Sequence, residues 1–168
     1  FSFNDIKELF LTKKNNRLTT QGLMPFQEID KLFWDIKADV FIPCAASRLV
    51  NQQHLERLIN SGTSLIACGA NVPFSDKEIF YGPIAEYADS NISLIPDFIS
   101  NCGMARVFAY LMENRRPLVT DEGVFKDCSN TIKQALLDCY NYSSSNNNIT
   151  SSALEIALKK LLIKEKKR

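Results

Sequence analysis

Histidine is almost absent from this sequence, and the cysteines do not form a metal-binding pattern. His54 is the one histidine among 168 residues, which excludes an H-E-x-x-H zinc site. The five cysteines are odd in number and none of them forms a C-x-x-C pair, so neither a disulfide framework nor a zinc knuckle is indicated. We therefore predict no bound metal, and we expect a protein of the reducing cytoplasm.

The sequence also lacks an excess of charge of one sign and lacks a long apolar run. Its 20 basic and 19 acidic residues give a formal net charge of +1, so we expect neither nucleic acid nor a membrane as partner. No apolar stretch approaches the roughly 20 residues of a membrane-spanning helix. Phe1 stands where a translated protein begins with Met, and we expect the chain to be a fragment.

Three short apolar runs, rich in residues that favour β-structure, predict buried strands. They are Val40–Ile42, Ser64–Ala67 and Ser93–Ile95. Helical segments separate these runs, and connections of this length carry a chain back over a sheet so that successive strands run parallel. The pattern therefore predicts an α/β fold that is built on a parallel sheet.

The segments around the strands carry helix signals. Two capping boxes, Ser75–Glu78 and Ser152–Glu155, predict that helices begin at these residues. Apolar residues at helical spacing predict further helices at residues 1–10, 25–33, 51–60, 101–114 and 121–140. We divide the chain into residues 1–114, which form the sheet, and residues 115–168, a helical segment that packs on it.

Small side chains follow every predicted strand, in the segments Cys44–Ser47, Cys68–Asn71 and Asn101–Gly103. Ligands of open parallel sheets bind beyond the carboxyl ends of the strands. Alanine and glycine let a flat ring or a ribose approach the backbone, and an asparagine offers both a donor and an acceptor. The pattern indicates either a cofactor site or simply tight turns between strands and helices.

Three motifs carry a more specific signal: Ala38–Ala45, Gly69–Pro73, and Ile95–Phe98 together with Asn101–Gly103. In order and spacing they resemble the C-terminal part of the NAD(P)-binding domain of the glutamate/leucine/phenylalanine/valine dehydrogenases. The helices predicted after residue 121 also resemble those of the family. The resemblance implies a partial Rossmann-like parallel sheet with C-terminal helices and NAD or NADP as cofactor. It further implies reversible oxidative deamination of an L-amino acid to a 2-oxo acid, in a homo-oligomer.

The resemblance places seven residues beside the cofactor. Those matching the segment that lines the adenosine and its ribose are Cys44, Ala45 and Ala46. Those matching the turn that faces the nicotinamide ribose are Gly69, Ala70 and Asn71, while Asn101 matches an asparagine near the nicotinamide and the substrate. All of these roles position a ligand, and we assign no catalytic residue.

The chain also departs from the family. The family has Asn-Ala-Gly-Gly where this chain has Asn101-Cys102-Gly103-Met104. The larger side chains of Cys102 and Met104 narrow the space that the resemblance assigns to the cofactor. The chain contains no G-x-G-x-x-G turn, no glycine-rich lysine motif and no matching catalytic aspartate, all of which the family carries upstream. We therefore expect the isolated chain to be inactive. The alternative hypothesis is a non-catalytic relict domain that serves in binding or assembly.

Three other candidates have both a functional and a structural interpretation. His54 is predicted to be a surface residue and not a general base. Asp97 is either catalytic or a cap of the following helix, and capping is favoured. Cys44, Cys68 and Cys102 form either a redox cluster or packed turns, and packing is favoured because no basic neighbour in the sequence lowers a thiol pKa.

Overall fold

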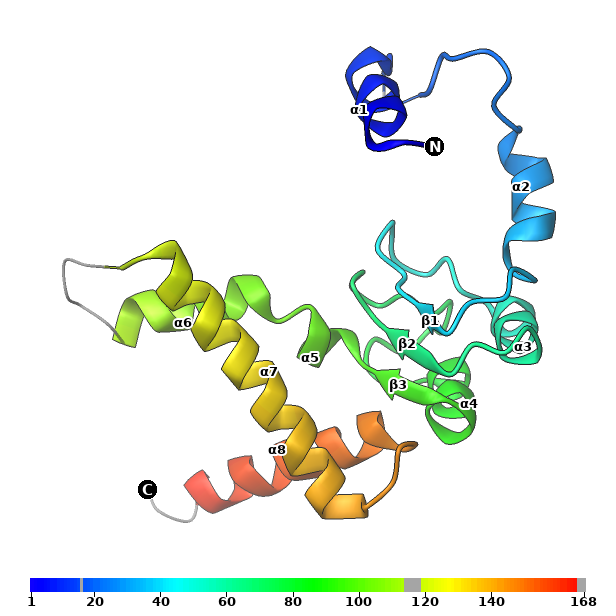
Figure 1. The fold of residues 1–168 in the computed structure, drawn as a ribbon. Coiled ribbons are helices and arrows are strands. Elements are labelled where there is room, and N and C mark those ends of the chain that lie inside the picture. The colour runs from blue at the N-terminus through cyan, green and yellow to red at the C-terminus, as the bar shows by residue number, and fades with distance from the viewer. Residues whose placement is uncertain (16, 114–118, 166–168) are drawn as a thin grey trace. The chain divides into compact units, whose positions relative to one another are not determined.

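The structure, a computed structural model, describes residues 1–15, 17–113 and 119–165. The chain forms two compact units, Phe1–Phe33 and Trp34–Arg168. Figure 1 shows the helices and strands of both. The domain boundary expected between residues 114 and 115, and the expected end of the helix at residues 101–114, lie outside the described residues.

In its described residues, 1–15 and 17–33, the first unit contains two helices, α1 (Phe3–Thr12) and α2 (Phe26–Phe33). A capping box begins α1, because Ser2 Oγ accepts from the Asp5 N–H (3.2 Å) while the Asp5 carboxylate accepts from the Ser2 N–H (2.6 Å). Neither helix has a buried residue. The two helices predicted at residues 1–10 and 25–33 are thus confirmed, and their apolar side chains are exposed except that of Leu9, which is half-buried.

The second unit is built on a parallel sheet of three strands, β1 (Val40–Phe41), β2 (Leu65–Ala67) and β3 (Ser93–Ile95). Their order in the sheet is β1-β2-β3, and both pairs of neighbours run parallel. Each predicted strand is therefore confirmed, with β1 and β2 each one residue shorter than expected. The α/β class that the sequence predicts is correct.

Two crossover helices pack on one face of this sheet. They are α3 (Gln52–Asn60) and α4 (Pro83–Asn91). Phe41, Ile66 and Leu94 pair across the strands, so their side chains point to the same face. Ile66 and Leu94 are buried in one core cluster with residues of both helices, among them Leu55, Leu58, Ala85 and Ala88. This core fixes the positions of the strand ends.

Among the residues that the structure describes, four helices follow the sheet: α5 (Asp97–Ser100), α6 (Gly103–Glu113), α7 (Asp121–Ser143) and α8 (Ile149–Glu165). The helix predicted from Asn101 begins instead at Gly103, because Asn101 lies in a turn between α5 and α6. Arg106 of α6 binds Asp127 of α7 through two guanidinium nitrogens, at 2.5 and 3.1 Å. In Figure 1, α8 folds back beside the C-terminal half of α7, and Lys160 and Asp138 join the two helices at 3.4 Å.

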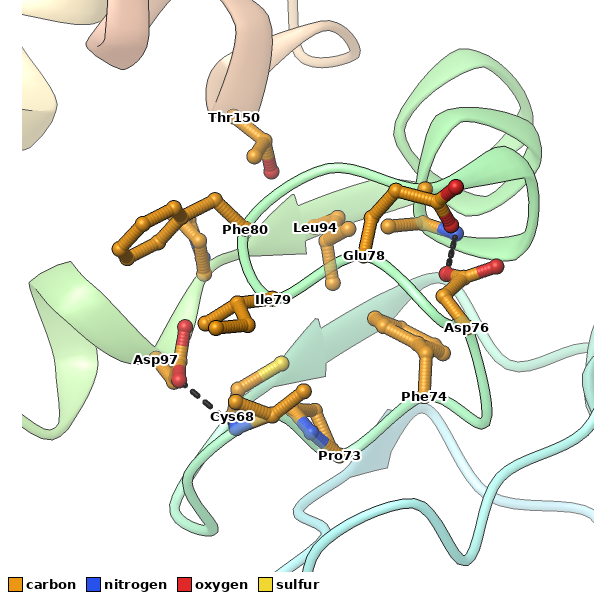
Figure 2. Close-up of a pocket in the computed structure, with 14 residues that line it drawn as sticks. Cys68, Pro73, Phe74, Asp76, Glu78, Ile79, Phe80, Leu94, Asp97 and Thr150 are labelled. Carbon is orange, nitrogen blue, oxygen red and sulfur yellow. Dashed lines mark hydrogen bonds between the residues drawn. The ribbon is translucent and has the colours of Figure 1, made fainter.

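The capping box predicted at Ser75–Glu78 is wrong as a helix start. The helix begins at Pro83, after the N-cap Gly82. Residues earlier in the chain satisfy its first amides: the Asp76 carboxylate accepts from the N–H groups of Ile84 and Ala85, both at 2.9 Å. Figure 2 shows the second of these bonds. An ionised carboxylate satisfies two amides at once, which a local serine hydroxyl does not.

The capping box predicted at Ser152–Glu155 is wrong for the same physical reason. Helix α8 begins at Ile149, so Ser152 already lies within it. The buried carboxylate of Asp89, on α4, accepts from the N–H groups of Thr150 (2.8 Å) and Ser151 (3.0 Å). A residue 61 positions earlier in the chain therefore caps this helix.

Candidate functional site

Three chain segments meet where β1, β2 and β3 end. The Ala70 N–H donates to the Pro43 carbonyl oxygen at 2.6 Å, and the Cys68 N–H donates to the Ile95 carbonyl oxygen at 3.0 Å. These bonds extend the contacts of the parallel ladder beyond the strands. The segments that the sequence singles out therefore lie side by side at the carboxyl edge of the sheet.

Gly69 allows the first two segments to approach each other. A Cβ atom at this position would lie 2.5 Å from the Sγ atom of Cys44 and 3.4 Å from the Pro43 carbonyl oxygen. The thiol of Cys44 therefore fills the space that a side chain at residue 69 would need. Cys44, Ala45 and Ala46 are all exposed, and small side chains leave the backbone of this edge accessible.

Asn71 and Asn101 join the second and third segments. The Asn101 Nδ2 group donates to the Asn71 Oδ1 atom at 2.7 Å, and both residues are exposed. An amide side chain carries two N–H donors and one acceptor oxygen. The bonded pair therefore still offers the Nδ2 group of Asn71 and the Oδ1 atom of Asn101 to a sugar hydroxyl or a carboxamide.

Ala70 has a different place from the other predicted contacts. Its side chain is buried, with 7% of its surface exposed, and its amide is bonded to Pro43. The structure thus brings all seven predicted residues to one edge of the sheet. Ala70 packs inside the turn, where its side chain is not accessible to a ligand.

Asp97 and Ser100 connect the same edge to α5. The Asp97 carboxylate accepts from the N–H groups of Val72 (2.8 Å) and Phe98 (3.0 Å), and Figure 2 shows the first of these bonds. Asp97 lies in the first turn of α5, where Pro96 is the N-cap. The Ser100 hydroxyl donates to the Cys68 carbonyl oxygen at 2.7 Å. Because Pro96 is the N-cap and no side-chain hydrogen bond caps the helix, the predicted capping role of Asp97 is wrong, and its carboxylate binds the Val72 N–H instead. No sequence signal identifies Ser100.

His54 is a packed residue of α3. Its ring stacks on Trp34, with 4.0 Å between the ring centroids and 8° between the planes. One ring nitrogen lies 3.1 Å from the Leu49 carbonyl oxygen and the other lies 3.3 Å from Asn51 Nδ2. The prediction of a surface residue is correct only in part, because the side chain is half-buried.

The thiols at the strand ends differ in their surroundings. Burial, together with the nearby charge of Asp97, raises the pKa of the Cys68 thiol to about 12. Burial and the neighbouring thiol of Cys128 raise the pKa of Cys102. These conditions disfavour thiolates and support the packing interpretation over a redox cluster.

We expect Cys68 to resist alkylation in the folded protein while Cys44 reacts. A thiol of pKa about 12 is ionised in about one molecule in 10,000 at pH 8, and its reactivity should rise about tenfold for each pH unit above that. Iodoacetamide labelling followed by peptide mass spectrometry at pH 7, 8 and 9 measures both rates. Labelling of Cys68 as fast as that of Cys44 at pH 7 would contradict this assignment.

A small cavity lies beside this edge, under the segment that leads from Asp76 to Gly82. Figure 2 shows Phe74, Phe80, Leu94 and Thr150 around it. Its volume of about 20 Å³ accommodates a water molecule and not a nucleotide. The candidate cofactor site is therefore the open edge itself.

No group of three or more His, Cys, Asp or Glu side chains is arranged to hold a metal ion among the described residues. No helix within the described ranges is long and apolar enough to cross a membrane.

Comparisons with known proteins agree with this fold. The chain is 36% identical over 52 residues to the NADP-specific glutamate dehydrogenase of Psychrobacter sp. (strain TAD1), a stretch that covers 31% of this chain and 12% of that protein. The structure of Plasmodium falciparum glutamate dehydrogenase 2 superimposes with a TM-score of 0.62 at 20% identity, over 95% of this chain and 36% of that chain. A second P. falciparum glutamate dehydrogenase gives a TM-score of 0.54 at 19% identity, over 76% of this chain and 29% of that chain.

The likeness to these structures concerns the fold, and this chain spans about a third of their length or less. The sequence model of the glutamate/leucine/phenylalanine/valine dehydrogenases matches residues 3–168. This chain therefore belongs to the glutamate/leucine/phenylalanine/valine dehydrogenase family.

Proposed function

We propose that this chain forms part of the NAD(P)-binding domain of an amino-acid dehydrogenase. The whole enzyme would oxidatively deaminate an L-amino acid to a 2-oxo acid and use NAD or NADP as cofactor. The observation that carries the proposal is the hydrogen bond between Asn71 and Asn101, which lies at one sheet edge with the exposed segment Cys44–Ala46. Ligands of open parallel sheets bind at this edge.

The residues at this edge fit a nicotinamide nucleotide. In the proposed site, Asn71 and Asn101 hold the nicotinamide ribose or the carboxamide through their remaining amide groups. Cys44, Ala45 and Ala46 lie beside the adenosine and its ribose, and Gly69 and Ala70 shape the turn between the two regions. A bound nicotinamide ring accepts a hydride, and this chain orients that ring without supplying an acid or a base.

The remaining parts of the proposal concern the whole protein. Glutamate is the favoured amino acid, because the similar proteins are named glutamate dehydrogenases. We further propose a homo-oligomer of the reducing cytoplasm, and the five free cysteines favour that compartment. The division into residues 1–114 and 115–168 also stays a proposal.

Saturation-transfer difference NMR with NAD⁺ and with nicotinamide mononucleotide tests the site directly. The 168-residue chain should bind NAD⁺ weakly, with a dissociation constant on the order of millimolar, because it offers only part of a cleft. Asn71→Ala and Asn101→Ala should reduce the saturation of the nicotinamide protons while the adenine signals persist. Asn91→Ala is the matched control, since Asn91 is an exposed asparagine at the opposite edge of the sheet, where α4 leads into β3.

The rival hypothesis is a relict domain that binds no nicotinamide nucleotide, and one departure from the family favours it. Cys102 replaces the family's alanine immediately after Asn101, and its thiol is half-buried close to Cys128. A folded chain that transfers no saturation to either nucleotide would support the relict domain and refute the cofactor site.

A further inference from the structure

The backbone at Val72 is held in an unfavourable conformation beside the candidate site. Its φ angle is 46°, in the left-handed region that a β-branched residue rarely adopts. Such a conformation persists only when the surrounding structure holds it in place.

Two hydrogen bonds hold the Val72 residue from both sides. Its N–H donates to the Asp97 carboxylate at 2.8 Å (Figure 2), and its carbonyl oxygen accepts from the Arg48 N–H at 2.8 Å. Arg48 itself has a φ angle of 61°. The bond that Val72 donates to Asp97 is the stronger of the two, because its acceptor is a carboxylate.

Helix α5, which Asp97 begins, also holds Asn101, the residue that bonds the Asn71 side chain. Asp97 begins α5, and the Asn101 N–H that follows this helix donates to the Asp97 carbonyl oxygen at 2.7 Å. Asn101 in turn bonds the Asn71 side chain at 2.7 Å. The dipeptide Asn71-Val72 is therefore held twice from α5, once through its backbone and once through its side chain.

We propose that Asp97 is a positioning residue that keeps Val72 in its left-handed conformation and thereby holds Asn71 against Asn101. This inference deepens the proposed function, on which its role in nucleotide binding rests. Asp97 acts through the Val72 amide and makes no contact with the nucleotide. We call the hydrogen bond from the Val72 N–H to the Asp97 carboxylate the Val72 clamp. In Asp97→Asn a single amide oxygen replaces a carboxylate that accepts from two N–H groups, so this clamp weakens.

Amide NMR tests the clamp without any nucleotide. In ¹⁵N-labelled protein, Asp97→Asn should move the Val72 amide proton upfield and should shift the side-chain NH₂ signals of Asn71 and Asn101. Asn91, whose side chain donates to Tyr87, supplies the control NH₂ signal. Unchanged signals of Val72, Asn71 and Asn101 in Asp97→Asn would overturn the proposal.

Nucleotide binding gives the second test, with nicotinamide mononucleotide as the probe. Asp97→Asn should raise its dissociation constant about tenfold, because the asparagine pair is no longer preorganised. Val72→Gly removes the strain that the clamp opposes, since glycine adopts positive φ angles freely. The double variant Asp97→Asn/Val72→Gly should therefore recover binding to within about threefold of Val72→Gly alone.

Each further outcome separates the two proposals. If Asp97→Asn weakens binding tenfold and Val72→Gly restores none of it, Asp97 contacts the nucleotide directly and the positioning role is wrong. If Asp97→Asn alone does not fold, the double variant is compared with Val72→Gly, and a tenfold difference between these two overturns the role. If the unchanged chain binds no nucleotide, the proposed function fails, while the NMR shifts still decide whether Asp97 positions Asn71.

Discussion

Asp89→Ala should lower the free energy of unfolding by about 3–5 kcal/mol. Asp89 is fully buried, and its carboxylate accepts from the N–H groups of Thr150 and Ser151 and from the Tyr81 hydroxyl at 3.1 Å. Burial and the charge of Asp89 raise the pKa of Tyr81 to about 12, as expected for a phenol that donates to a carboxylate. The substitution removes the acceptor of one buried donor, the Thr150 N–H, and of two half-buried donors, the Ser151 N–H and the Tyr81 hydroxyl. Urea unfolding followed by circular dichroism measures the loss.

Glu155→Gln is the matched control, because the sequence alone assigns the capping of α8 to the Ser152–Glu155 box. Glu155 is exposed and accepts from Tyr142 outside the first turn of the helix. Its substitution should change the free energy of unfolding by less than about 0.5 kcal/mol. A larger loss in Glu155→Gln than in Asp89→Ala would mean that α8 is capped locally after all.

Gly82→Ala should cost about 2–4 kcal/mol of stability. Gly82 has φ −96° and ψ −179°, an extended conformation that alanine adopts readily. The cost is steric instead, because the added Cβ atom would lie 2.5 Å from both Cβ and Cγ of Asp76. Relieving that contact displaces the carboxylate from the Ile84 and Ala85 amides, so the helix α4 loses its cap.

Gly103→Ala is the control for this steric argument. Gly103 begins α6, and a Cβ atom there would meet nothing within 4 Å. This substitution should leave stability unchanged or raise it by up to about 1 kcal/mol, as alanine does in a helix. In an Asp76→Gly background, which removes both Cβ and Cγ of residue 76, Gly82→Ala should cost less than it does alone, and equal costs in both backgrounds would exclude Asp76 as the group displaced.

The sequence was sufficient to place the strands and most helices because local patterns determine them. The runs around Val40, Leu65 and Ser93 are apolar and bounded by Pro, Gly or polar residues, and the structure places strands there. The same local patterns misplaced the starts of α4 and α8. Aspartates that are remote in the sequence, Asp76 and Asp89, satisfy those helix ends, and no local pattern reveals which distant carboxylate reaches a given amide.

The candidate site was accessible to sequence analysis only through motif resemblance. Small residues at strand ends are equally consistent with tight turns, and the bond between Asn71 and Asn101 joins residues 30 positions apart. The clamp on Val72 was not predictable at all, because a valine with positive φ contradicts its own conformational preference. Tertiary contacts from α5 override that preference.

The link between Asp89 and the start of α8 also orders events during synthesis of the chain. Ribosomes add about 5–20 residues per second, so the 61 residues from Asp89 to Thr150 take about 3–12 s to follow. During that interval the Asp89 carboxylate lacks the Thr150 and Ser151 amides, and burying it without these partners costs free energy. The nascent sheet and α4 should therefore remain loosely packed until residues 149–151 emerge, which makes the C-terminal helix pair the element that completes the fold.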